Sequence, residues 1–198
     1  MNDERSETTE NAVAASSQRP TVIASFSGYT PPFNPVPLVE RMVASVPPKY
    51  LMGLKQVVLT NSGALSRKLR RSVTKARKRK GRVVEVGGRY HPAWHGKRAW
   101  IEIFVDNKLR GVEQSWWLKI GYIRETALAG VLFHEIGHHI HATTHPEYRD
   151  KEDVADTWKR KLNGQYFRSQ HPLVRAFAYP LRPLLQLIAR FLKAKTAQ

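Results

Sequence analysis

The chain has 198 residues, and its 33 lysine and arginine residues outnumber its 16 acidic residues, which gives a formal net charge of +17. Its length suits one domain, or one domain with an arm, and its 41% hydrophobic content allows most of the chain to bury a core. The absence of cysteine excludes disulfides, iron–sulfur clusters, thiolate zinc sites and thiol catalysis. The first twenty residues do not resemble a secretory signal, and no stretch approaches the roughly 20 apolar residues of a membrane span. We therefore expect a soluble, cytoplasmic protein.

The positive charge is concentrated in one part of the chain. Between Arg41 and Ile101 there are 16 lysines and arginines and a single acid, and residues 67–82 contain 10 basic residues in 16. Such a run attracts polyanions, nucleic acid first of all. The centre of the run is Arg77, Lys78, Arg79 and Lys80. Two interpretations stay open, a nucleic-acid contact and a general tether to any acidic partner.

The first half of the chain predicts an arm followed by the start of a domain. Residues 1–35 are rich in serine, threonine and then proline, which predicts a disordered arm and a Pro-rich linker. Apolar residues at helical spacing predict a short helix over 38–46, and the QVVLT segment predicts a strand over 56–60. The basic run at 67–82 is then a surface insertion, and a second strand over 83–86 ends at a glycine pair.

The second half predicts one good strand and two helices. Alternating residues predict a strand over 99–106, and a 3.6-residue repeat of apolar side chains predicts a helix over 120–141. A second helix is expected over 150–162. The domain would span 36–170 as an α+β fold, with a small, mostly antiparallel sheet packed on these helices. Residues 171–198 form an amphipathic C-terminal segment that packs on the domain or on a partner; a membrane-surface contact is the alternative.

The first of these two helices carries the motif with chemical meaning. His134-Glu135-Ile136-Gly137-His138 is an HExxH sequence, and residues four apart on a helix lie on one face. Both imidazoles can therefore reach one tetrahedral Zn²⁺ ion. Glu135 lies beside them, where it can act as general base toward a metal-bound water.

A catalytic zinc site needs a third protein ligand. The metzincin pattern fails, because position 144 is threonine where that pattern has histidine. Glu152 and Asp156 lie one turn apart on the second helix, so Glu152 is the favoured third ligand and Asp156 the favoured hydrogen-bond partner of a ligand histidine. The other acidic and histidine candidates downstream of the motif are His141, His145, Glu147 and Asp153.

These segments carry a family resemblance. LFHEIGHHIH at 132–141, followed by EDVADTW at 152–158, resembles the gluzincin metallopeptidases, and is most similar to the small minigluzincin-like and ImmA/IrrE-like groups. The resemblance covers roughly residues 56–162. It implies a zincin-like fold, a zinc cofactor, a glutamate ligand on the second helix and a sheet whose edge strand binds substrate. That edge strand would be 99–106. The basic insertion and the C-terminal segment depart from the family pattern.

The expected function is hydrolysis of peptide bonds by a zinc-activated water, with Glu135 moving the proton to the leaving amine. Candidate oxyanion or substrate contacts are Tyr90, His91, His145 and Tyr148. The basic surface suggests substrates associated with nucleic acid. The alternative is a nucleic-acid-binding protein with a structural or vestigial metal site. Residues 89–98 mix aromatic and basic side chains, which fits either base stacking or the lining of an active-site cleft.

Overall fold

The computed structural model describes residues 19–65, 78–79, 82–83, 87–110, 116–144 and 152–172. The chain divides into two compact units, Met1–Leu162 and Asn163–Gln198. The strands are β1 (Thr21–Ala24), β2 (Leu54–Thr60), β3 (Lys78–Arg79), β4 (Arg82–Val83), β5 (Gly88–His91) and β6 (Ala99–Phe104). The α-helices are α2 (Val36–Ser45), α4 (Val105–Leu109), α5 (Gly121–Thr144) and α6 (Glu152–Gln170). Short 3₁₀ turns cover Pro48–Tyr50, Ser62–Ala64 and Trp116–Lys119.

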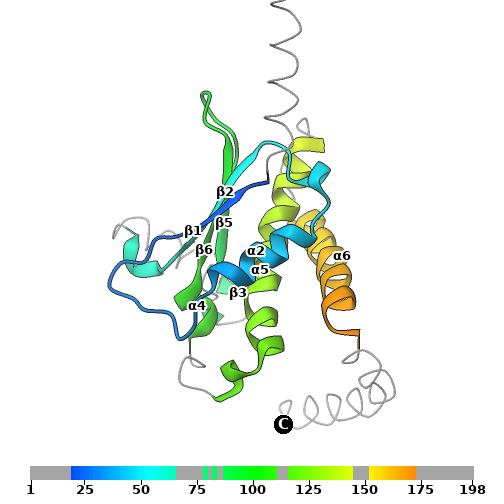
Figure 1. Ribbon diagram of the computed structural model, residues 1–198. Coiled ribbons are helices and arrows are strands. Elements are labelled where there is room, and N and C mark those ends of the chain that lie inside the picture. The colour runs from blue at the N-terminus through cyan, green and yellow to red at the C-terminus, as the bar shows by residue number, and fades with distance from the viewer. Residues whose placement is uncertain are drawn as a thin grey trace, which may run out of the picture. The chain divides into compact units, whose positions relative to one another are not determined.

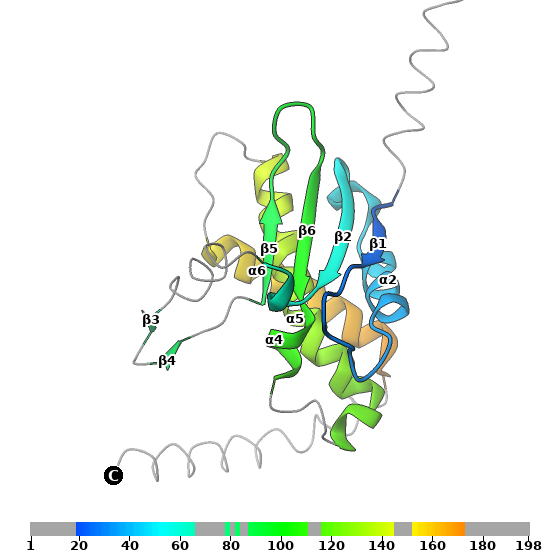
Figure 2. The ribbon, with the colours of Figure 1, turned by 90° about the vertical axis from the view of Figure 1, so that its left-hand side faces the viewer.

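The first unit is built on a four-stranded sheet with the order β1-β2-β6-β5 (Figure 2). β1 pairs with β2 in parallel, β2 pairs with β6 in parallel, and only β5 is antiparallel to its neighbour β6. The α+β class is confirmed, but the prediction of a mostly antiparallel sheet is wrong. The connection from β1 to β2 contains α2, and a crossover of this kind makes consecutive strands parallel.

The strand β1 lies within residues 1–35, the segment predicted as a disordered arm and Pro-rich linker, so that prediction is wrong for Thr21–Ala24. Thr21, Val22 and Ile23 are β-branched residues that favour an extended backbone. They are set in register against Gln56, Val57 and Val58 of β2. Serine- and proline-rich residues flank this four-residue strand. A prediction from composition averages over a longer window and therefore does not detect the strand.

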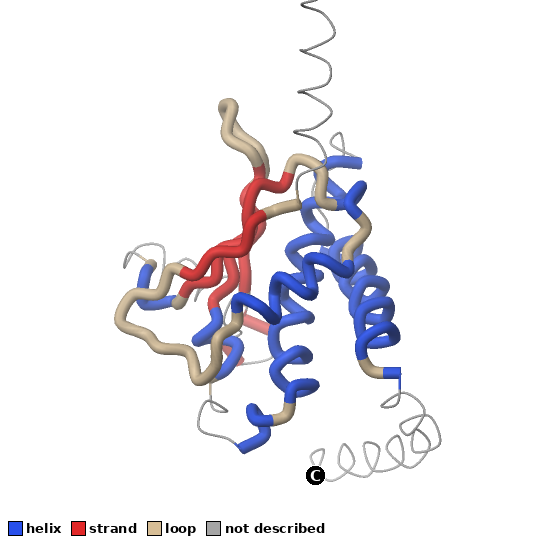
Figure 3. The backbone as a smooth tube through the Cα atoms, in the orientation of Figure 1, coloured by secondary structure: helices blue, strands red, loops and turns tan. Residues whose placement is uncertain are grey.

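The helices α2 and α5 lie on one side of the sheet (Figures 1 and 3). α2 contacts β1 and α5, and α5 contacts β5 and β6. The core between these layers is formed by fully buried side chains of both strands and helices: Val39, Met42, Val57, Leu59, Ile101, Ile103, Leu128, Leu132, Ile136 and Ile140. The apolar spacing that predicted the α5 helix therefore marks the face that packs on the sheet.

The positions of β5 and β6 correct two predictions. Of the strand predicted over 83–86, Val83 belongs to β4 and residues 84–86 lie outside the described part of the chain, while β5 begins at Gly88, in the glycine pair that was expected to end a strand. Residues 99–106 were expected to form the edge strand, but β6 lies between β2 and β5, so the edge beside α5 is β5. β6 also ends two residues early, because α4 begins at Val105.

The longer helices agree with their predicted positions. α2 and α5 match the predicted ranges to within three residues at each end, while α6 extends to Gln170, beyond the predicted end at 162. None of the helices in these described ranges has the length and apolar character that a membrane crossing requires. The predicted C-terminal amphipathic segment from residue 173 onward lies outside the described residues.

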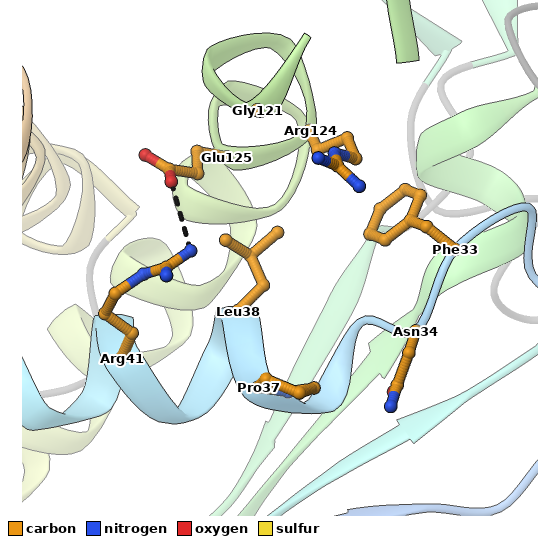
Figure 4. A pocket seen from close by; sticks show the side chains of 8 residues that line it. All are labelled: Phe33, Asn34, Pro37, Leu38, Arg41, Gly121, Arg124 and Glu125. Atoms are coloured by element: carbon orange, nitrogen blue, oxygen red, sulfur yellow. Dashed lines mark hydrogen bonds and ion pairs between the residues drawn. The ribbon is translucent and has the colours of Figure 1, made fainter. Parts of the chain in front are cut away.

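An ion pair between the exposed Arg41 and the buried Glu125 joins α2 to the start of α5 (Figure 4). Arg41 Nη2 lies 3.2 Å from Glu125 Oε1, and Glu125 is only 6% exposed. Beside it is a hollow of about 140 Å³, which Phe33, Leu38 and Arg124 also line. None of the HExxH residues lines this hollow, so we assign it a role in helix packing.

Asn61 joins the segment after β1 to the end of β2 through both ends of its amide. Ser27 N donates to Asn61 Oδ1 at 2.8 Å, and Asn61 Nδ2 donates to the Ser27 carbonyl at 2.9 Å. Asn61 is 4% exposed. We predict that Asn61→Ala lowers the free energy of unfolding by about 2 kcal/mol, because it leaves two Ser27 backbone groups without their partner. Urea denaturation measures this loss, and Lys55→Ala on the exposed side of β2 is the control expected to change stability little.

Candidate metal centre

The two motif histidines turn the same ring nitrogen toward a common point. His134 Nε2 and His138 Nε2 lie 3.2 Å apart, with the two rings perpendicular at a centroid distance of 4.7 Å. The spacing of four residues places both on one face of α5. His138 is 8% exposed, and the side chain of His134 is 18% exposed.

The predicted third ligand meets these histidines from α6. Glu152 Oε2 lies 3.3 Å from His134 Nε2, and one ligand atom from each of His134, His138 and Glu152 can be chosen so that all lie within 4.8 Å of one another. The Glu152 side chain is 56% exposed, so the cluster is open to solvent on that side. Glu152 begins α6, so its carboxylate also interacts favourably with the positive end of the helix dipole.

Gly137 allows α6 to come this close. A Cβ atom at Gly137 would lie 2.7 Å from the Ala155 carbonyl oxygen and 2.9 Å from Ala155 Cα. Contacts that short are not found in proteins, so the two helix backbones touch only because residue 137 has no side chain. Trp158 then packs on the ring of Tyr50, with ring centroids 4.9 Å apart.

Asp156 orients His134 through Nδ1, the ring nitrogen that does not face His138 and Glu152. His134 Nδ1 lies 3.0 Å from Asp156 Oδ1, and Lys159 Nζ donates to the same oxygen at 2.7 Å. The hydrogen bond from Lys159 and the nearby His134 hold the pKa of Asp156 below its ordinary value, so Asp156 is a carboxylate that accepts. His134 Nδ1 therefore carries the proton. Burial, with a smaller effect of His138, lowers the pKa of His134 despite the nearby carboxylates, so the ring is neutral and Nε2 has a free lone pair.

These distances and protonation states suit a metal ion. Ligand atoms about 2.0–2.1 Å from a tetrahedral zinc ion are separated by roughly 3.3 Å. The measured separations from His134 Nε2 are 3.2 Å to His138 and 3.3 Å to Glu152. A lone pair of a neutral imidazole directed at a carboxylate oxygen is repulsive without a cation between them. Two nitrogens and one carboxylate oxygen form a donor set that zinc takes readily.

Glu135 lies on the sheet side of the motif, next to β5. It is 6% exposed, and a Cβ atom at Gly88 would lie 3.0 Å from Glu135 Oε1 and 2.6 Å from Val131 Cγ2. The edge strand thus passes directly over the Glu135 carboxylate, and glycine is the residue that leaves room for it. Glu135 is not part of the three-residue cluster, which agrees with its predicted role as a base and not a ligand.

Tyr90 and His91 point to opposite faces of β5. The Tyr90 hydroxyl lies 3.2 Å from His139 Nδ1, while His139 Nε2 lies 3.0 Å from the Met52 carbonyl. His91 stacks on Trp100 at a ring distance of 3.8 Å and lies 3.3 Å from Glu102. Tyr90 is therefore on the helix side, beside α5, and the structure does not bring His91 to the metal cluster.

The remaining sequence candidates fall into two groups. His141 and Asp153 are described, but neither joins the metal cluster. His145, Glu147 and Tyr148 lie outside the described residues, as do Arg77 and Lys80. Lys78 and Arg79 form β3, which pairs with β4, and their side chains are not described.

Lys108 is a site neighbour that the sequence did not indicate. Its aliphatic chain fills the space that a side chain at Gly87 would need. Burial lowers the pKa of Lys108, the nearby Lys159 ammonium lowers it further, and Glu135 raises it. Lys108 belongs to α4, a five-residue helix whose first two residues were predicted as the end of a strand, so no helical pattern placed it near α5.

Comparison of the chain with protein-family models, with curated proteins and with solved structures found no match.

We predict that Gly137→Ala weakens zinc binding by at least about tenfold, the size of effect seen when the groups that orient metal ligands are disturbed. The added methyl group forces α6 away from α5 and separates Glu152 from the two histidines. Competition with a chromogenic chelator measures the affinity. Gly130→Ala is the matched control on the same helix, since a Cβ there meets nothing within 4 Å. Equal zinc affinity in both variants would contradict this account of the glycine.

We predict that His139 makes the protein less stable as the pH falls below the ordinary histidine pKa of 6.5. Burial lowers the pKa of His139 in the folded state, so between the two pKa values the unfolded chain binds a proton that the folded chain does not. The free energy of unfolding then decreases as the pH falls through this range. His139→Gln removes the titrating group, so urea denaturation between pH 7.5 and 5.5 should give a shallower pH dependence than in the wild type. An unchanged slope would argue against a neutral, buried His139.

Proposed function

We propose that the protein is a zinc-dependent metallopeptidase of the gluzincin type. The observation that carries this proposal is the convergence of His134, His138 and Glu152: His134 Nε2 lies 3.2 Å from His138 Nε2 and 3.3 Å from Glu152 Oε2, and one ligand atom of each residue lies within 4.8 Å of the others. Two further features support it. Asp156 fixes the tautomer of His134, and Glu135 lies outside the ligand set but next to it in the sequence.

His134, His138 and Glu152 would hold the ion, which when bound supplies Lewis acidity and lowers the pKa of a coordinated water. The described residues offer three ligands, as in catalytic zinc sites, whereas structural sites are closed by four protein ligands. The exposure of Glu152 leaves the side of the cluster toward solvent open for a substrate. We therefore favour a catalytic site over a structural one.

Glu135 is the proposed general base. It accepts the proton of the attacking water and donates it to the amine that leaves when the peptide bond breaks. Its carboxylate is buried under Gly88 at 6% exposure, so it has little freedom to turn away from the site. Lys108 lies close enough to this carboxylate for Glu135 to raise the pKa of the lysine, against the larger lowering by burial.

β5 is the proposed substrate-binding edge. In the described part of the chain β5 pairs only with β6, so its other edge is available to an extended peptide. An added strand there would run beside Glu135, because Gly88 lies against that residue. A side chain at position 88 would push β5 away from α5, so this position of the strand requires glycine.

We predict that Glu135→Gln retains about one zinc per chain while peptidase activity falls at least about 100-fold, the contribution usual for a general base. His134→Ala and Glu152→Ala should lose both zinc and activity. Zinc is measured by atomic emission after dialysis, and activity by mass spectrometry on a diverse peptide library. Asp153→Asn is the matched control, since this exposed acid is the direct neighbour of Glu152 but not in the cluster.

The alternative function, nucleic-acid binding with a structural metal, gives a different result. The wild type would then bind zinc in a one-to-one ratio and cleave no peptide in the library. Glu135→Gln would leave nucleic-acid binding unchanged.

A further inference from the structure

The hairpin that joins β5 to β6 ends in a tight turn. Trp94 N donates to the Lys97 carbonyl at 3.0 Å, and Lys97 N donates to the Trp94 carbonyl at 2.9 Å. Between them, His95 and Gly96 have φ angles of 45° and 76°. Two consecutive positive φ angles are typical of the type I′ turn, whose twist matches that of the strands it joins. The tip therefore has a defined conformation.

This hairpin tip, residues 92–98, extends past the ends of the neighbouring strands (Figure 2). All seven of its residues are exposed. Trp94 is 72% exposed, the highest value among the exposed large hydrophobic side chains in the described part of the chain. A tryptophan that is exposed to solvent on a turn of defined conformation contributes little to folding. Exposed aromatic side chains of this kind are typical of contact surfaces.

The charged residues of the hairpin segment 86–101 are all basic. Lys97 and Arg98 lie on the tip and Arg89 lies on β5, and there is no acidic residue from 86 to 101. The nearest acid on β6, Glu102, lies opposite Arg89 in the strand register and is 3.3 Å from His91, so Lys97 and Arg98 are the cations of this surface that lie farthest from an acid in the hairpin. The partner of this surface therefore has negative charge and a flat group that can cover an indole ring.

The base of the hairpin carries a second flat aromatic surface. The rings of His91 and Trp100 stack at 3.8 Å with an angle of only 1° between their planes. Cross-strand register pairs these two residues directly. The ribbon thus has aromatic groups near its base and at its tip, with cationic side chains between and beside them.

We propose that the β5–β6 hairpin binds single-stranded nucleic acid, with a base stacked on Trp94 and phosphates bound by Lys97, Arg98 and Arg89. Aromatic platforms combined with a cationic groove are the usual means of binding single strands without sequence preference. An acidic peptide satisfies the charge but offers no base to cover the indole. Paired bases inside a duplex hide both faces within the stack, so the unpaired strand fits best.

This site is independent of the proposed peptidase activity, since none of its residues belongs to the metal cluster. It is also distinct from the basic run at 67–82, which carries more charge but no aromatic residue. Since β5 continues from the hairpin to Gly88 beside Glu135, a strand bound at the tip would lie along the same ribbon that borders the metal centre.

The test uses the full chain and four probes. Three are fluorescein-labelled strands: a 15-nucleotide thymidine DNA strand, the matching uridine RNA strand and an abasic 15-mer. The fourth is heparin, which is used as a competitor. Fluorescence anisotropy gives the affinity for the strands, and competition gives that for heparin. Trp94→Ala should weaken binding of a base-containing strand at least about fivefold and leave the abasic strand and heparin unchanged, because stacking requires a base. Trp94→Phe should restore much of the loss. The DNA and RNA arms show which strand is preferred.

Two controls separate stacking from charge and from folding. Trp116→Ala removes another tryptophan, 58% exposed on a separate 3₁₀ turn, and should leave every affinity unchanged. The double variant Lys97→Ala/Arg98→Ala should weaken all four probes and reduce the salt dependence of strand binding by roughly 0.7 per lost phosphate contact. Circular dichroism and urea denaturation serve as the check on folding in each variant.

Three results would overturn the proposal. The first is no binding of either strand by the wild type. The second is an unchanged affinity in Trp94→Ala, which would assign all binding to the basic run. The third is an equal loss for the abasic strand or for heparin in Trp94→Ala, which would show that the indole contacts polyanions without stacking on a base. Loss of peptidase activity in Glu135→Gln, or its absence in the wild type, leaves these results unaffected.

Discussion

The contact between two helix backbones at Gly137 and Ala155 is the constraint on which the candidate site depends. α5 brings His134 and His138 to one face by local geometry alone, but a third ligand has to come from another element. α6 supplies Glu152 and Asp156 one turn apart, and both reach His134 only if the helix axes are unusually close. Within the HExxH sequence the glycine thus determines packing, and the histidines and glutamate supply chemistry.

A second glycine has the matching role on the other side of α5. Gly88 lets the edge strand lie against Val131 and Glu135, so the metal side and the sheet side of the motif helix are both fixed by direct backbone approach. Close packing of this kind holds functional groups more firmly than long side chains do, because backbone atoms have few alternative positions. The sheet explains why α5 itself is stable. Leu128, Leu132 and Ile136 are buried completely against it.

The parts of this arrangement that sequence predicted are those encoded by local periodicity. The ranges of α2 and α5, the buried face of α5 and the ligand pair four residues apart all follow from a 3.6-residue repeat. Glu152 and Asp156 could be proposed because they share a helix face, but their distance to His134 depends on Gly137. The strand direction was not predictable locally, since it depends on the α2 crossover. The strand β1 was not predicted because its four residues, three of them β-branched, lie in a segment whose composition is typical of disorder. The strand β5 was not predicted because a glycine pair usually ends a strand. His139 and Lys108 are buried by residues that are distant in the sequence. The residues next to them in the sequence therefore do not predict their burial.

The lysine beside Asp156 shows how a basic chain can serve a site made of histidines and acids. An ion pair as exposed as Lys159–Asp156, with side chains 34% and 49% exposed, contributes only about 0–1 kcal/mol to stability. Its effect on the site is of another kind. By donating to Asp156 Oδ1 it keeps that carboxylate ionised and turned toward α5, and the carboxylate in turn holds the proton of His134 on Nδ1. The free lone pair on Nε2 follows from this arrangement. The interaction with Lys159 thus supports the carboxylate that sets the tautomer of His134, although it adds little to the stability of the fold.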